Sequence, residues 1–188
     1  MSLEGMMYSE NSITTNKGIG INGGTVNKVM KLKKYPYIIY SSDISVTSST
    51  SEAILTIDPG AVLKFGSNRS FTVNTGGRLI AQGTATEKIH FIGLVADKGY
   101  WYGIHFRGSS VLSGNILNNC VISHGGYGST WTSKGNISCV ETLADRITIQ
   151  NCLITMSLRN GIFLSSAGNV SRNNNVFEDI DGDDVKVE

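Results

Sequence analysis

A chain of 188 residues is long enough for one domain with a buried core. Charged residues make up 16% of the sequence and the formal net charge is +1, so no positive field gathers nucleic acid by neutralising phosphates, and no nucleic-acid partner is expected. No apolar run approaches the ~20 residues that span a bilayer, so no membrane span is expected.

The first 54 residues are interpreted as a tail followed by an end cap. Residues 1–20 begin with MSLEG and are expected to be a vector-derived tag or a disordered segment, with any native leader removed. Residues 21–54 are expected to form irregular strands that cap a repetitive domain, because a bare terminal repeat would leave strand edges unpaired. The lysines of this segment are interpreted as a solvated edge. They are Lys28, Lys31, Lys33 and Lys34.

From residue 55 to residue 188, short apolar strands recur, each closed by Gly, Asn or Pro-Gly. The strands are too short for hairpin sheets, and helical periodicity is absent. A chain that coils, and places each strand above its counterpart one turn earlier, satisfies both observations. The sequence therefore predicts an all-β parallel β-helix, or β-solenoid, of about six coils spaced ~4.8 Å apart. Residues 21–188 are expected to form this single domain, which ends inside a coil strand and is expected to be truncated or capped by association through its exposed terminal coil.

Two series of apolar residues are expected to stack from coil to coil. The first series is Leu63, Leu79, Ile104, Ile137, Ile162 and Val185. The second series is Ile57, Val73, Phe91, Val121, Leu153 and Val176. Asn119, Asn151 and Asn174 each stand two residues before a member of the second series, and we interpret them as corner residues with left-handed backbone.

Four segments of the N-terminal half resemble a known group of proteins. They are INGGTV (21–26), YPYIIYSSDISV (35–46), LTIDPGAVLKF (55–65) and GGRLIAQGTATEKIHF (76–91). These segments are similar to the opening coils of right-handed parallel β-helix proteins of the pectate-lyase-like superfamily, in particular bacterial surface or secreted members. The resemblance implies a right-handed helix over about residues 20–188. It does not imply an activity, because the superfamily contains lyases, hydrolases, adhesins and non-catalytic surface proteins. Glu87-Lys88 replaces a common proline, which should alter only a turn.

The three cysteines lie in apolar, strand-like contexts without CxxC spacing. We interpret Cys120, Cys139 and Cys152 as buried small hydrophobic residues.

Two corners between strands are longer than the others and fall on adjacent coils, within residues 94–107 and 122–135. Both tryptophans of the chain lie in these corners, together with tyrosines and flanking cations. Aromatic rings pack on the C–H faces of sugars and polar neighbours bind the hydroxyls, so the corners are a candidate carbohydrate-binding site. The alternative is that the rings only plug the corners. The candidate residues are Tyr100, Trp101, Tyr102, His105, Arg107, His124, Tyr127 and Trp131.

The acidic tail EDIDGDDVKVE is a second candidate site. Asp179, Asp181, Asp183 and Asp184 are candidate calcium ligands, although their spacing is not that of an EF-hand and a Gly-Asp turn is an ordinary β-helix corner. GDDVKV also resembles the paired aspartates of polygalacturonase-type glycoside hydrolases, which would act as general acid and base. The companion motifs of that group are missing. A pectate lyase would need an arginine base beside a calcium-carboxylate cluster, and no acidic residues are expected beside Arg107 on the adjacent strands. Apart from calcium, no cofactor is expected.

These observations favour a non-catalytic module, secreted or displayed on a cell surface, that binds a polysaccharide or surface glycan through its aromatic corners. Two alternatives stay open. One is a polysaccharide lyase or glycoside hydrolase whose site is incomplete in this chain, and the other is a structural spacer or adhesin stalk.

Overall fold

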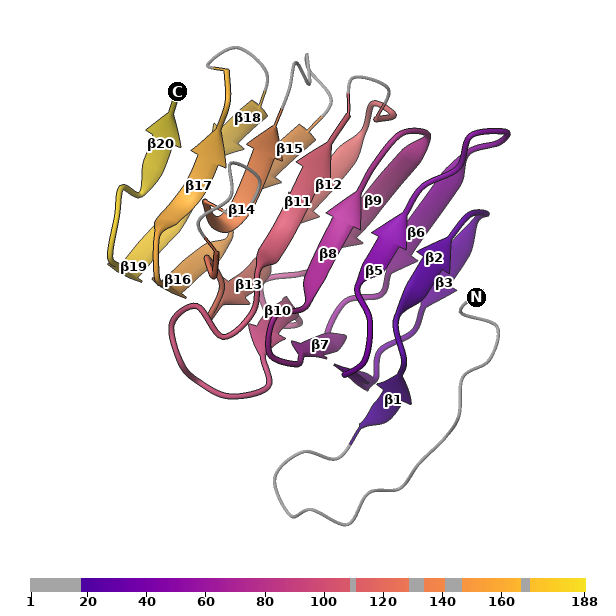
Figure 1. Ribbon diagram of the computed structural model, residues 1–188, viewed down its shortest axis with the longest axis horizontal. Helices are drawn as coiled ribbons and strands as arrows, with labels where there is room; N and C mark the ends of the chain where they lie inside the picture. Colours follow the sequence, from indigo (N-terminus) through magenta and orange to yellow (C-terminus); the bar gives the residue numbers. More distant parts are fainter. Residues whose placement is uncertain (1–17, 109–110, 129–133, 141–146, 167–169) are drawn as a thin grey trace.

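A computed structural model of the chain describes residues 18–108, 111–128, 134–140, 147–166 and 170–188. Within these ranges the regular secondary structure consists of β-strands alone, and the strands form three parallel sheets (Figure 1). Each coil gives one strand to the first, second and third sheet in turn, so the chain is a right-handed parallel β-helix of about six coils. Of residues 1–20, which we expected to be a tag or disordered, residues 1–17 lie outside the described residues, whereas Ile19 and Gly20 belong to a strand that pairs with Tyr37 and Ile38.

The strands of each sheet follow one another in sequence order. The first sheet contains β1 (Ile19–Ile21), β4 (Pro36–Ile39), β7 (Val62–Phe65), β10 (Ile89–Gly93), β13 (Cys120–Ser123), β16 (Leu153–Ser157) and β19 (Val176–Ile180). The second contains β2 (Gly24–Val26), β5 (Ile44–Val46), β8 (Ser70–Val73), β11 (Gly103–Arg107), β14 (Gly135–Val140), β17 (Asn160–Leu164) and β20 (Val185–Val187). The third contains β3 (Met30–Leu32), β6 (Ala53–Ile57), β9 (Gly77–Gln82), β12 (Asn115–Asn118), β15 (Ile147–Gln150) and β18 (Val170–Asn173).

The segment 21–54 is more regular than its sequence suggests. Its strands β2, β3, β4 and β5 pair in parallel with strands of the following coil. These strands lie at the N-terminal end of the sheets, where the cap was expected, but they continue the coil repeat.

The first stacking series is confirmed in its last four members and wrong in its first two. Ile104 pairs with Ile137, Ile137 with Ile162, and Ile162 with Val185, all in the second sheet. Leu63 instead pairs with Phe91 in the first sheet, and Leu79 pairs with Leu55 in the third. A coil has three strands, and Leu63 in β7 and Leu79 in β9 lie on the first and third strands of the same coil, so they cannot stack one above the other.

The second series shows the same pattern. Val121 pairs with Leu153, and Leu153 with Val176, as expected. Phe91 pairs with Ile122 and not with Val121, so the series is shifted by one residue at that point. A shift of one residue reverses the face, because side chains along a strand alternate. Phe91 is therefore buried, whereas Val121 lies on the outer face of the sheet.

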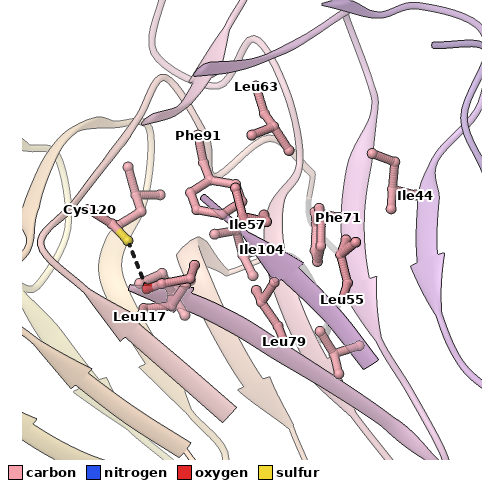
Figure 2. Close-up of a cluster of buried hydrophobic side chains, with 14 of the residues drawn as sticks. Ile44, Leu55, Ile57, Leu63, Phe71, Leu79, Phe91, Ile104, Leu117 and Cys120 are labelled. Carbon is pink, nitrogen blue, oxygen red and sulfur yellow. Dashed lines mark hydrogen bonds between the residues drawn. The ribbon is translucent and has the colours of Figure 1, made fainter. Parts of the chain in front are cut away.

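The interior of the column is a continuous stack of apolar side chains from all three sheets (Figure 2). Phe71 meets Phe91 edge to face with ring centroids 5.8 Å apart, and meets Phe65 in the same way at 6.4 Å. Such burial is the main stabilising term for a fold whose strands make only short ladders.

The corner asparagines have the backbone expected of them. Asn119, Asn151 and Asn174 have φ values of 49°, 54° and 53°, in the left-handed region. Asn151 also links two coils, because its Nδ2 donates to Oδ1 of Asn118 at 2.9 Å.

Candidate functional site

The long loop between β10 and β11 runs along the column and not around it (Figure 1). The backbone N–H of Gly99 donates to the carbonyl of Gly125 on the next coil at 3.1 Å. A Cβ added to Gly99 would lie 2.6 Å from Cδ2 of Leu158, so Leu158 of the coil after that packs directly on this glycine. Gly99 has φ +72°, which an L side chain rarely adopts, so both the backbone and the contact require glycine. We call residues 94–102 the strap.

Lys98, in the middle of the strap, reaches the acidic tail. Lys98 Nζ lies 2.5 Å from Oδ1 of Asp179 and 2.5 Å from Oδ1 of Asp181. Hydrogen bonds that Lys98 donates to these two carboxylates raise its pKa above the usual value. The two segments that the sequence offered as separate candidate sites are therefore joined by one ion-pair network.

The remaining acidic residues do not gather into a metal site. Asp183 pairs with Lys186 at 3.2 Å, and Asp184 is exposed. Within the described ranges no group of three or more His, Cys, Asp or Glu residues could hold a metal ion. Lysines pair with three of the four aspartates of the tail.

Trp101 belongs to the core, which corrects our expectation of a surface ring. Its exposed fraction is 0%, and its ring stacks on Phe65 with centroids 4.2 Å apart and an angle of 8° between the planes. Its Nε1 donates to the carbonyl of Ser123 at 2.7 Å. Gly103, the first residue of β11, has φ +106° and so interrupts the extended backbone. The alternation of inward and outward side chains along β11 therefore does not extend back to Trp101. Trp131 lies outside the described residues.

Two tyrosines from neighbouring coils meet at the surface. The rings of Tyr102 and Tyr127 have centroids 5.5 Å apart and are tilted by 49°. The backbone N–H of Tyr127 donates to the carbonyl of Trp101 at 3.2 Å, which fixes Tyr127 against the strap. Tyr127 is 43% exposed and Tyr102 is half-buried.

Tyr100 and His124 lie together at the end of β10. A Cβ added to Gly93 would lie 3.0 Å from Cβ of His124 and 3.2 Å from Cδ1 of Tyr100, so both side chains border this glycine. His124 Nδ1 lies 3.1 Å from Oγ of Ser123. Burial lowers the pKa of His124, so its imidazole is neutral near pH 7. We call Tyr100, Tyr102, His124 and Tyr127 the aromatic corner.

His105 is buried, although it alternates with the inward residues of β11. Its Nε2 donates to the carbonyl of Tyr102 at 3.2 Å, so the ring supports the aromatic corner from below. Burial lowers the pKa of His105 to about 4, since the charged form would lose its hydration. At neutral pH His105 is therefore uncharged, and its ring nitrogen holds the backbone of Tyr102.

Arg107, at the end of β11, is half-exposed. Its Nε donates to Oδ1 of Asn74 at 3.4 Å, and Asn74 Nδ2 donates in turn to Oγ of Ser45 at 3.0 Å. This polar row crosses three coils on the outer face of the second sheet. The guanidinium has further N–H donors that such a row can present to a hydroxyl or carboxylate.

Sequence reasoning missed the residues that hold the two loops together. Asn136 is fully buried, its Oδ1 accepts from the N–H of Gly125 at 2.7 Å, and its Nδ2 donates to the carbonyl of Thr155 at 2.8 Å. Lys98 and Leu158 were missed as well. A signal for Lys98 existed, because it is the only lysine in an insertion otherwise followed by aromatic residues, but its partners lie more than 80 residues away.

Comparison with protein-family models, with curated proteins and with solved structures found no match for the chain. Within the described residues, no helix has the length and apolar character needed to cross a membrane.

Proposed function

We propose that this β-helix binds a carbohydrate at the aromatic corner and acts as a non-catalytic module, secreted or displayed on a cell surface. The observation that carries the proposal is the Tyr102–Tyr127 pair, in which rings from neighbouring coils lie 5.5 Å apart with Tyr127 facing solvent. Aromatic faces contact the C–H faces of a sugar ring, and each phenol keeps a hydroxyl for hydrogen bonding. A relationship to secreted members of the pectate-lyase-like superfamily is part of this proposal and is supported by the fold and the N-terminal motifs.

The corner is held rigidly, which favours binding. The strap is fixed at Gly99 and Lys98. On the next coil, Asn136 holds the backbone of Gly125, and the carbonyl of Trp101 holds that of Tyr127. A surface that is already ordered loses little conformational entropy when a ligand binds. His124 supplies a polar group beside the ring of Tyr100, because both side chains border Gly93.

The test is a glycan array with the purified protein, run with and without calcium, and with product analysis of every hit. Tyr127→Ala and Tyr102→Ala should each weaken binding about five- to tenfold, since loss of one stacking contact removes roughly 1–1.5 kcal/mol. Tyr40→Ala is the matched control, because Tyr40 is 44% exposed just after β4, two coils before the strap. Binding that survives in both corner variants contradicts the proposal. Cleavage of a bound glycan would support a lyase or hydrolase.

The burial of Trp101 favours a second candidate function, a structural spacer or stalk. In that case the aromatic residues serve only to close the corner. The same array separates the two candidates, because a spacer binds no glycan and its Tyr127→Ala variant changes nothing but local packing.

A further inference from the structure

Two of the three cysteines are stacked on neighbouring coils. Val121 pairs with Leu153 in the first sheet, so the residues that precede them, Cys120 and Cys152, occupy equivalent positions. Both side chains are buried, and the thiols donate to backbone carbonyls of earlier coils, Cys120 to Ala81 at 3.6 Å and Cys152 to Leu117 at 3.5 Å. Figure 2 shows Cys120 pointing into the apolar interior with Phe91 and Leu117.

The spacing of the two residues suits a covalent link. Equivalent residues on adjacent strands are separated by about 4.8 Å, and disulfides join Cα atoms that are roughly 4.4–6.8 Å apart. Because the two residues occupy equivalent positions on paired strands and both side chains are buried, closing an S–S bond requires rotation of side chains and no exchange of strands.

We propose that Cys120 and Cys152 are a redox pair that forms a disulfide in the folded protein when a peroxide is supplied, clamping two consecutive coils. The thiolate of Cys152 attacks one peroxide oxygen and breaks the O–O bond, giving a sulfenic acid and, after protonation, water. The Cys120 sulfur then attacks the Cys152 sulfur and displaces the hydroxyl as a second water. Overall, two thiols and one hydrogen peroxide give one disulfide and two waters.

The surroundings assign the order of these steps. Burial raises the pKa of the Cys120 thiol well above its usual value, so Cys120 forms little thiolate. Cys152 is therefore the attacking sulfur and Cys120 the resolving one. Cys152 also directly follows the exposed corner residue Asn151, so a small oxidant has a short path to it.

Cys139 provides an internal control. It is buried in the second sheet, where its partners on the neighbouring strands are Phe106 and Leu164 and not cysteines. Burial raises the pKa of Cys139 to about 12, so it forms little thiolate. It should stay reduced under conditions that oxidise the pair.

The experiment treats the folded, reduced protein with hydrogen peroxide, blocks the remaining thiols, and maps tryptic peptides without reduction. The three cysteines fall on three tryptic peptides, 108–134, 135–146 and 147–159. We expect 108–134 and 147–159 to appear as one linked species, lighter by two hydrogen atoms than their sum, with 135–146 alkylated. We also expect the oxidised protein to melt at a higher temperature than the reduced protein, because the link constrains the unfolded chain.

Two variants keep the proposal open to refutation. Cys139→Ser should retain the linked species, and Cys120→Ser should lose it and leave Cys152 as a sulfenic acid that dimedone labels. The proposal is overturned if the folded protein forms no linked species while the urea-unfolded protein does, or if links involve Cys139 as often as Cys120.

Discussion

Lys98 and Asp181 form an ion pair, with Nζ and Oδ1 2.5 Å apart, although β13 and β16 separate their strands in the first sheet. Asp179 completes the contact from the same tail. The strap therefore ties the coil of β10 to the coil of β19 without any backbone pairing between them. An insertion of this kind orders a corner of the column and, with it, the aromatic residues that the corner carries.

Removing the two carboxylates should release the strap. In the double variant Asp179→Asn/Asp181→Asn, Lys98 loses its ionic partners, and trypsin should cleave after Lys98 several-fold faster than in the parent protein. Time courses of limited proteolysis measure this rate. Asp183→Asn is the control, because Asp183 pairs only locally with Lys186. Equal cleavage rates in the parent and the double variant would show that the strap is held by Gly99 and Leu158 alone.

Acid should destabilise the protein through His105. Its pKa is about 4 in the folded chain against 6.5 for a free histidine, so between these values the unfolded chain binds more protons than the folded chain. Stability is therefore full above pH 6.5 and falls as the pH drops towards 4, by on the order of 3 kcal/mol for this buried group.

The measurement for His105 is urea unfolding at pH 7 and at pH 4.5, in the parent protein and in His105→Gln. Glutamine can donate to the carbonyl of Tyr102 but does not titrate, so the variant should lose less stability on acidification. His90 and His124, whose pKa values are also lowered by burial, remain in both proteins and cancel in the comparison. A pH dependence that is the same in both proteins contradicts the assignment.

The sequence was sufficient for the fold because the repeat is local. Short alternating strands recur in every coil, and left-handed asparagine corners recur in the last three, at Asn119, Asn151 and Asn174. Each recurrence is visible without knowledge of distant partners. The register was recovered only where coils have similar lengths. It failed at Leu63 and Leu79, because a two-strand repeat cannot describe a coil with three strands.

The candidate site was predicted less well because its residues depend on non-local contacts. The position of Tyr127 on a long corner indicated exposure correctly. Trp101 has the same kind of neighbours in the sequence, and only the stacking on Phe65 shows that it is buried. The partners of Lys98 lie three coils away, and no local pattern in the sequence encodes such a contact.

Ile137 lies at the centre of the second-sheet stack, between Ile104 and Ile162. Ile137→Asp should unfold the column, because an unpaired charge in the interior costs several kcal/mol or more. Val29→Asp is the matched control, since Val29 is 68% exposed and should tolerate the same change. Thermal unfolding followed by circular dichroism measures the melting temperature of both variants. A melting temperature unaltered by Ile137→Asp would contradict the register of the second sheet.

Substitution of Trp101 should lower the stability of the fold, and should change ligand binding only through that loss of stability. Trp101→Ala removes a fully buried ring that stacks on Phe65 and bonds to the carbonyl of Ser123, so it should cost about 3–5 kcal/mol. Trp101→Phe keeps the stacking and loses only the N–H, and should cost less. Chemical unfolding curves measure both values. If glycan binding is found, Trp101→Phe should retain it at a temperature where the variant is folded, whereas Tyr127→Ala should not. A folded Trp101→Phe protein that fails to bind would give the buried ring a direct part in recognition.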